Sequence, residues 1–236
     1  MKTFISIVEY IISRLKGDKA YKINIDFTFA QLIRIVYYRI VQIFRGLLSR
    51  IFIKQVKGLL FAGTKIILEH SNQLRIGKNV IIEDGVFINA LSRDGISFGD
   101  NVTIAKYSIV TCTGVISHMG VGIVIGNNSA VGAQSFLGGQ GGIIIGNDVI
   151  MGAGVRIFSE NHNYSRSDII IRKQGENRTG VIIENNCWIG ASVTILDGCV
   201  IGTGSVIAAG AVVTHSVSEN SIVAGIPGKI IKKRVM

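Results

Sequence analysis

An apolar residue recurs every six positions from Ile76 to Val213, and a glycine often follows it. The repeating positions form six sets of three: Ile76, Ile82 and Ile88; Phe98, Ile104 and Val110; Ile125, Val131 and Leu137; Ile145, Met151 and Ile157; Ile183, Ile189 and Ile195; Ile201, Ile207 and Val213. A small or β-branched residue often stands four positions later, and Cys187 and Cys199 occupy such places. This period predicts a short strand and a turn in each unit. Three units close a triangle, and the triangles stack as a parallel β-solenoid.

The period fails at four places, where extra residues must leave the stack as loops. The insertions are of four residues around Asn89–Ile96, nine around Thr111–Ile123, two near Gly138–Gly142 and 20 around Ser159–Ile182. The last is polar in a chain that has only 17% charged residues. Because functional residues of rigid scaffolds collect on loops, we expect the catalytic loop at 159–182.

The N-terminal segment follows a different pattern. Helical spacing relates Ile33, Val36, Ile40, Phe44, Leu47 and Ile51, which predicts an amphipathic helix flanked by arginines. Residues 1–60 carry 11 Lys and Arg against three acidic residues, so +8 of the net charge of +10 lies there. Two interpretations are open: a helix packed on the protein or on a partner subunit, or a helix lying on an anionic membrane surface. No nucleic-acid motif accompanies the charge, so we expect no nucleic-acid partner.

Composition narrows the class of protein. The 236 residues are 48% hydrophobic, with 29 glycines and one proline, which excludes a disordered chain and collagen. The mean hydropathy is +0.45, yet no run of about 20 apolar residues predicts a membrane span. Glu9 interrupts the early apolar residues and no cleavage site follows, so we expect no signal peptide. Three scattered cysteines suit a cytoplasmic protein, with contact to the inner face of the cell membrane if residues 1–60 bind lipid.

The long insertion holds the best candidate for acid–base chemistry. His162 opens it beside Glu160, Asp168 and Glu176, and an imidazole near a carboxylate is what a general base requires. His118, on the nine-residue insertion, is a weaker candidate. Of the four histidines only His162 lies in a plausible site, so no set of three is available to hold zinc and we expect no metal.

The C-terminal half resembles a known family. The runs CWIGASVTILDGCVIGTGSVIAAGAVVT and AGIPGKIIKK are similar to the hexapeptide-repeat acyltransferases, in the branch of the maltose, galactoside and nodulation-factor O-acetyltransferases. The resemblance spans about residues 125–234 and implies a mainly β fold, a left-handed parallel β-helix with an N-terminal α-helical segment. We therefore divide the chain into a basic helical segment (1–62), a β-helix domain (63–230) and a basic tail (231–236). The family also implies acetyl-CoA as co-substrate and a closed homotrimer.

The resemblance also implies roles for individual residues. His162 would take the proton from a sugar hydroxyl as its oxygen attacks the thioester of acetyl-CoA, and Glu176 would orient or stabilise the imidazolium, with Glu160 and Asp168 as rivals for that role. The positions that correspond to coenzyme-binding residues are Ala191, Ala209, Thr214, His215, Lys229 and Lys232. Both lysines replace arginines of the galactoside enzyme, and a lysine cannot make a bidentate contact with phosphate.

The residues expected to bind the acceptor match that branch less well than the coenzyme-binding residues do. Gln140 stands where the galactoside branch has a sugar-binding Asp, and Asn161 and Tyr164 are the other acceptor-binding candidates. The basic segment 1–62 replaces the usual N-terminal cap. The layout is closer to acetyltransferases of capsule, O-antigen and exopolysaccharide synthesis, so we expect a sugar or glycan acceptor. Two alternatives stay open: acetylation of an amine on a nucleotide-linked sugar, and a scaffold without catalysis.

Overall fold

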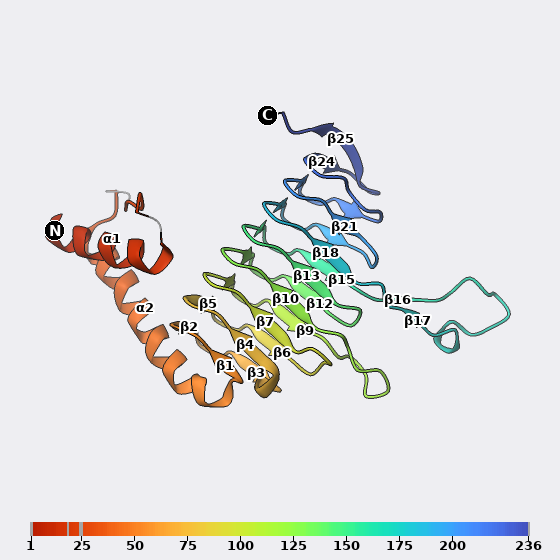
Figure 1. Cartoon of the computed structure of the whole chain (residues 1–236), viewed down its shortest axis with the longest axis horizontal. Coiled ribbons are helices and arrows are strands. Elements are labelled where there is room, and N and C mark those ends of the chain that lie inside the picture. The colour runs from red at the N-terminus through yellow and green to blue at the C-terminus, as the bar shows by residue number, and fades with distance from the viewer. Residues whose placement is uncertain (1, 18, 24–25, 236) are drawn as a thin grey trace.

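The computed structural model shows a triangular stack of short parallel strands with two helices at one end (Figure 1). It describes residues 2–17, 19–23 and 26–235; residues 1, 18, 24 and 25 of the predicted helical segment and residue 236 of the predicted tail lie outside the described residues. The helices are α1 (Lys2–Lys16) and α2 (Phe29–Ser49), and the short 3₁₀ helices are η1 (Arg50–Phe52), η2 (Ser71–Gln73) and η3 (Ile171–Lys173).

Each of the first seven coils contributes one strand to each of three sheets, called A, B and C in the order in which the chain visits them, and β24 and β25 extend sheet B alone. Sheet A holds β1 (Gln55–Val56), β4 (Leu74–Ile76), β7 (Ile96–Phe98), β10 (Ile123–Ile125), β13 (Ile143–Ile145), β18 (Val181–Ile183) and β21 (Val200–Ile201). Sheet B holds β2 (Leu60–Ala62), β5 (Val80–Ile82), β8 (Thr103–Ile104), β11 (Ala130–Val131), β14 (Ile150–Met151), β19 (Trp188–Ile189), β22 (Val206–Ile207), β24 (Ser221–Ala224) and β25 (Lys229–Lys233). Sheet C holds β3 (Ile67–Glu69), β6 (Phe87–Asn89), β9 (Ile109–Thr111), β12 (Phe136–Gly138), β15 (Arg156–Phe158), β20 (Thr194–Ile195) and β23 (Val212–Val213). A separate antiparallel pair is formed by β16 (Asn161–His162) and β17 (Glu176–Asn177).

The six sets of apolar residues form the core of the solenoid, which confirms the predicted repeat. No member is more than 4% exposed, and Cys187 and Cys199 are buried beside them. Burial raises the pKa of both thiols, so these cysteines are packing groups rather than nucleophiles.

The corner between sheets A and B explains the recurrent Asn and Asp residues. Asn79, Asn101, Asn128, Asp148 and Asn186 have φ between 56° and 58°, a left-handed conformation that short polar side chains tolerate. Beside them, the side-chain oxygens of residues 100, 127, 147 and 185 each accept a backbone N–H of the preceding coil at 2.7 Å. From the second coil to the sixth, this corner thus provides acceptors for its own backbone N–H groups.

The solenoid begins earlier and ends later than the predicted boundaries. β1 and β2 belong to a complete first coil, so the boundary between residues 62 and 63 cuts through it. The inward positions of this coil are Val56, Ala62 and Leu68, which keep the six-residue spacing but stand just after the helical stripe. At the other end, the predicted tail overlaps β25, which pairs antiparallel with β24.

Helix α2 is attached to the first two coils by a polar and close-packed face. Leu32, Gln42 and Gly46 are buried there, and a Cβ at Gly46 would stand 1.9 Å from the carbonyl oxygen of Leu60. The Tyr38 hydroxyl donates to both carboxylate oxygens of Asp84 at 2.8 and 2.9 Å, and Arg39 pairs with Glu83 at 3.0 Å. Neither α1 nor α2, as described, is long and apolar enough to cross a membrane.

Asp84 makes the attachment of α2 dependent on pH. Burial raises the pKa of this carboxyl, but hydrogen bonds from the Thr64 backbone N–H and the Tyr38 hydroxyl lower the pKa by more, to well below its usual range. A lowered folded-state pKa contributes stability above the unfolded value of about 3.9, which is lost as the pH falls through the folded value. We therefore expect the protection of residues 29–49 against hydrogen exchange, measured relative to the intrinsic rate at each pH, to fall below about pH 4.

The substitution Asp84→Asn should give the same loss of protection at pH 7. The free energy of opening of α2 should fall by about 1.5–3 kcal/mol, because hydrogen bonds to a charged group are lost. Asp168→Asn is the matched control, since the pKa of that carboxyl is also lowered, by its hydrogen bond from Arg166, but on a distant loop. Equal exchange of α2 in Asp84→Asn and in the unmodified protein would contradict the assignment.

Candidate active site

All four predicted insertions meet at one corner of the solenoid. They follow β6, β9, β12 and β15, and each joins sheet C to the next strand of sheet A. Because the coils stack in register, loops that are far apart in sequence lie along one edge. The two longest leave that edge side by side, the first after β9 and the second as β16 and β17 (Figure 1).

The 20-residue insertion begins as a hairpin that is held at its base. His162 of β16 lies directly opposite Glu176 of β17 in the antiparallel register. Asp197, at the same corner one coil later, accepts the backbone N–H groups of Thr179 at 3.0 Å and Gly180 at 2.7 Å. The positions of His162 and Glu176 are therefore set by a strand pair and a fixed base.

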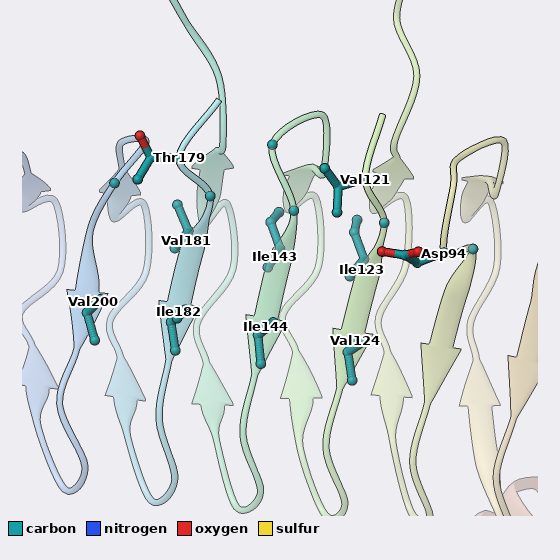
Figure 2. A pocket seen from close by; sticks show the side chains of 16 residues that line it. Asp94, Val121, Ile123, Val124, Ile143, Ile144, Thr179, Val181, Ile182 and Val200 are labelled. Carbon is teal, nitrogen blue, oxygen red and sulfur yellow. The ribbon is translucent and has the colours of Figure 1, made fainter. Parts of the chain in front are cut away.

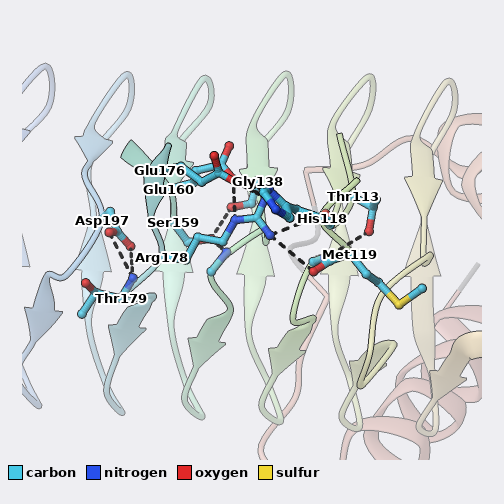
Figure 3. Close-up of polar contacts among 12 residues, drawn as sticks. Thr113, His118, Met119, Gly138, Ser159, Glu160, Glu176, Arg178, Thr179 and Asp197 are labelled. Atoms are coloured by element: carbon cyan, nitrogen blue, oxygen red, sulfur yellow. Dashed lines mark hydrogen bonds and ion pairs between the residues drawn. The ribbon is translucent and has the colours of Figure 1, made fainter. Parts of the chain in front are cut away.

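Arg178 joins the two longest loops (Figure 3). Its guanidinium contacts Glu160 Oε2 at 2.6 Å and Glu176 Oε1 at 3.5 Å, and Nη1 donates to the carbonyl oxygen of Met119 at 3.4 Å. The side chains of Arg178 and both glutamates are no more than 24% exposed. One cation thus pairs with two partly buried carboxylates and holds the nine-residue loop against the hairpin.

His118 shares Glu176 with Arg178. Its Nδ1 is in contact with Glu176 Oε1, whereas the exposed imidazole of His162 makes no hydrogen bond or ion pair within the described ranges of the chain. The sequence identified His118 as the weaker candidate and gave no partner for it, and Arg178 was not identified at all. The position of the insertions in the repeat could have indicated this contact. Both insertions follow a strand of sheet C, so their residues leave the solenoid at the same corner.

The three carboxylates that could assist His162 lie in two different places. Glu160 and Glu176 both belong to the Arg178 cluster. Asp168 lies beyond the hairpin and pairs with Arg166, whose Nε donates to Asp168 Oδ1 at 3.1 Å. The structure therefore groups two of the three with the histidines and leaves Asp168 outside.

The predicted acceptor-binding residues lie along the same edge of the solenoid but differ in how far they stand from its surface. Gln140 lies in the turn after β12, and its carbonyl oxygen accepts the N–H of Val121 at 3.0 Å under the nine-residue loop. Asn161 is exposed in β16, opposite Asn177. Tyr164 is 76% exposed beyond the hairpin. Gln140 and Asn161 thus border the cluster, and Tyr164 is directed to solvent.

The predicted coenzyme residues fall in three places. Ala191 and Ala209 are exposed and stack at the corner between sheets B and C, where a Cβ on Gly190, the residue before Ala191, would stand 2.5 Å from the Ala209 nitrogen. Thr214 and His215 follow β23 on the loop edge and contact each other at 2.8 Å. Lys229 and Lys232 are exposed on β25. Strands β20 and β23 run across sheet C from the alanine corner to the loop edge, so they connect the first two places.

An apolar hollow of about 320 Å³ lies on the outer face of sheet A, beside the base of the loops (Figure 2). Val124, Ile144 and Ile182 project into it from three neighbouring strands, and all three are exposed. This outward face was not predicted, because only the inward residues carry the six-residue period. Within the part of the chain that the structure describes, no group of three or more His, Cys, Asp or Glu could hold a metal ion.

Comparisons with known proteins agree with the repeat. The bacterial transferase hexapeptide family (six repeats) matches residues 180–215, and the hexapeptide repeat of succinyl-transferase matches residues 120–159. These segments correspond to coils on both sides of the long insertion.

Two relatives and one solved structure are similar over longer stretches. WbbJ of Escherichia coli K12, named as an O-acetyl transferase of lipopolysaccharide biosynthesis, is 27% identical over 79% of this chain and 84% of its own length. The galactoside O-acetyltransferase of Lactococcus lactis is 33% identical over 57% of this chain and 61% of its own length. The N-acyltransferase AntD of Bacillus cereus, solved with dTDP and 3-hydroxybutyryl-CoA, shares the fold with a TM-score of 0.54 at 20% identity, over 81% of this chain and 88% of its own.

Proposed function

The chain belongs to the hexapeptide-repeat acyltransferases, with their left-handed β-helix, and we propose that it moves an acetyl group from acetyl-CoA to a hydroxyl of a surface-polysaccharide sugar. The observation that carries the proposal is the β16–β17 hairpin, which places His162 opposite Glu176 on the loop edge of the solenoid. The names of the two O-acetyltransferase relatives support a sugar hydroxyl as the acceptor.

In the proposed reaction the acceptor oxygen attacks the thioester carbonyl carbon directly. The imidazole of His162 takes the hydroxyl proton as the new C–O bond forms. The tetrahedral intermediate collapses with cleavage of the C–S bond, and the imidazolium returns the proton to the departing sulfur. No acyl-enzyme forms, so one histidine acts first as base and then as acid. Backbone N–H groups of the corner would stabilise the oxyanion.

Glu176 would stabilise the imidazolium that forms during turnover. Its carboxylate lies on the strand opposite His162 and is held by Arg178 and His118. Because the carboxylate is already ordered, little rearrangement is needed when the histidine becomes charged. His118 would act as a positioning residue through Glu176, and Gln140 and Asn161 would contact the acceptor.

The co-substrate would lie along the corner between sheets B and C and across sheet C toward the hairpin. The exposed alanines leave room for the pantetheine arm to approach the backbone, and the cations at Lys229 and Lys232 suit the coenzyme's phosphates. Ala209→Glu should raise the KM for acetyl-CoA about tenfold, because it adds bulk and negative charge there.

Ala133→Glu is the matched control, since Ala133 stands at the same turn position three coils earlier. Steady-state kinetics with acetyl-CoA varied at a fixed acceptor concentration would measure both variants. Equal KM values for the two variants would place the coenzyme elsewhere.

We further propose that the chain acts as a homotrimer. The exposed aliphatic face of sheet A, at Val124, Ile144 and Ile182, is the surface best suited to subunit contact, and flat solenoid sides pack well around a threefold axis. This contact would bring a neighbouring subunit beside the loop edge.

Thiol release from acetyl-CoA by the purified protein tests the function. The acceptor panel should contain simple sugars, polysaccharide fragments and amino sugars. Release that requires a hydroxyl acceptor supports O-acetylation, and release that requires only an amine acceptor would assign N-acetylation instead. Absence of acetyl-CoA binding in a direct titration would favour a scaffold without catalysis.

A further inference from the structure

Helix α2 is oriented with its most apolar face away from the solenoid. The face contains Ile33, Tyr37, Ile40, Phe44 and Leu47 of α2 and Ile51 of the following η1, and these side chains are between 44% and 79% exposed. Val36 of the predicted stripe is half-buried. The opposite side of the helix makes the contacts with β2 and with Asp84. Of the two interpretations of the helical stripe, packing on this chain's own solenoid is therefore wrong for these residues. A contiguous apolar surface of this kind indicates a binding surface.

The surroundings of the face are basic. No acidic residue occurs between Phe27 and Leu68, whereas seven Lys and Arg residues do. Arg34 and Arg45 border the apolar face on the same helix. A second copy of this chain would bring its own basic residues to such a face, with unfavourable repulsion. An anionic lipid surface would accept both the cations and the apolar side chains.

A hollow beside the face carries independent evidence for an anion. It has a volume of about 380 Å³ and is lined by Arg45, Leu48, Ser49 and Lys65 among others. Leu48 is 61% exposed, so the hollow opens next to the apolar face. Within the described residues, Nη1 of Arg45 is buried and has no hydrogen-bond partner. A buried guanidinium nitrogen without an acceptor is costly, and a phosphate oxygen would satisfy it.

We propose that the apolar face of α2 lies in the surface of an anionic phospholipid membrane, with a lipid phosphate in the hollow beside Arg45. The helix would lie along the interface, since neither described helix is suited to crossing a membrane. Helices α1 and α2 occupy the end of the solenoid before the first coil, away from the β16–β17 hairpin (Figure 1). The hairpin leaves the fifth coil, which at about 4.8 Å per strand places it about 19 Å along the axis from the first coil. The surface could therefore bind lipid while the loop edge remains accessible.

Flotation with lipid vesicles tests the proposal on the full chain. Vesicles of phosphatidylcholine with about one third phosphatidylglycerol should carry the protein, and pure phosphatidylcholine vesicles should carry far less. Binding should fall as NaCl rises toward 1 M, because exposed charge interactions are screened. The double variant Ile40→Ser/Phe44→Ser should bind at least about tenfold more weakly, since two exposed apolar side chains that enter the membrane are lost. Arg45→Gln should weaken binding to the anionic vesicles and leave the residual binding to neutral vesicles unchanged.

Ile150→Ser is the matched control, because Ile150 is an equally exposed apolar residue on sheet B, far from α2. It should float like the unmodified protein. Failure to float with anionic vesicles at low salt would overturn the proposal, as would unchanged binding of the double variant. Sedimentation equilibrium of the double variant supplies the other decisive result: a lower oligomeric state would identify the face as a contact between copies instead. None of these measurements depends on acetyl transfer.

Discussion

Replacement of His162 by alanine should lower acceptor-dependent release of CoA by about 10²- to 10⁴-fold, the usual contribution of a positioned general base. The reason is that a sugar hydroxyl is a poor nucleophile until its proton is removed during attack on the thioester. The His162 side chain is exposed on β16, so its loss leaves the core of the solenoid unchanged. Thiol detection with the best acceptor, together with thermal unfolding, would measure activity and folding in the same preparation.

His118→Ala separates the two histidines of the loop edge. Because His118 acts through Glu176, its loss should lower kcat by roughly tenfold, well short of the loss in His162→Ala. The conservative His118→Asn should restore part of that activity, since an amide can still donate to the carboxylate. If His118→Ala were instead the more damaging variant, the base would be His118, and the hairpin would serve to position it.

The regular part of the fold was predictable because its signal is local and repeated. Each inward residue of the six sets is fixed by its own six-residue unit, so an error in one unit does not propagate to the next. The first coil was missed because Val56, Ala62 and Leu68 follow directly after a helical stripe, where two periods compete. Because this one coil was not predicted, the predicted domain boundary was misplaced, but the predicted architecture was unaffected.

The orientation of α2 could not be predicted from its pattern. An amphipathic stripe ordinarily packs inward, yet Gly46 and the Tyr38–Asp84 hydrogen bonds bring the other side of the helix onto the first coils. The hydrogen bonds join residues that are 46 positions apart, so no helical period records them. The structure thus shows that the apolar stripe of α2, for which the sequence left two interpretations open, is exposed.

The place of the candidate site could be predicted from the sequence, but the contacts among its side chains could not. The period locates every insertion and therefore the corner where the loops meet. It does not say which carboxylate each basic group contacts, because that depends on side chains from loops of different length. The pairing of Arg178 with Glu160 and Glu176, and of His118 with Glu176, emerges only when the nine-residue loop lies against the hairpin.

Arg178→Met should lower kcat by about 10²-fold with little change in the KM for acetyl-CoA. Methionine keeps much of the side-chain volume but removes the cation that contacts both Glu160 and Glu176. The two partly buried carboxylates would then repel each other, and removal of one member of such a group is costly. The carbonyl oxygen of Met119 would also lose its donor, so the nine-residue loop should loosen.

Arg166→Met is a closely matched control for this prediction. Arg166 lies on the same insertion and also pairs with a carboxylate, Asp168, but the pair is solvent-exposed and lies outside the cluster. Exposed pairs contribute little, so we expect nearly unchanged kcat and unchanged hydrogen exchange in residues 112–122. In Arg178→Met, exchange in that segment should rise together with the loss of kcat. Equal kinetics in the two variants would mean that the cluster only supports the loop, whereas faster exchange with a lower kcat would establish that the guanidinium holds the site in its working arrangement.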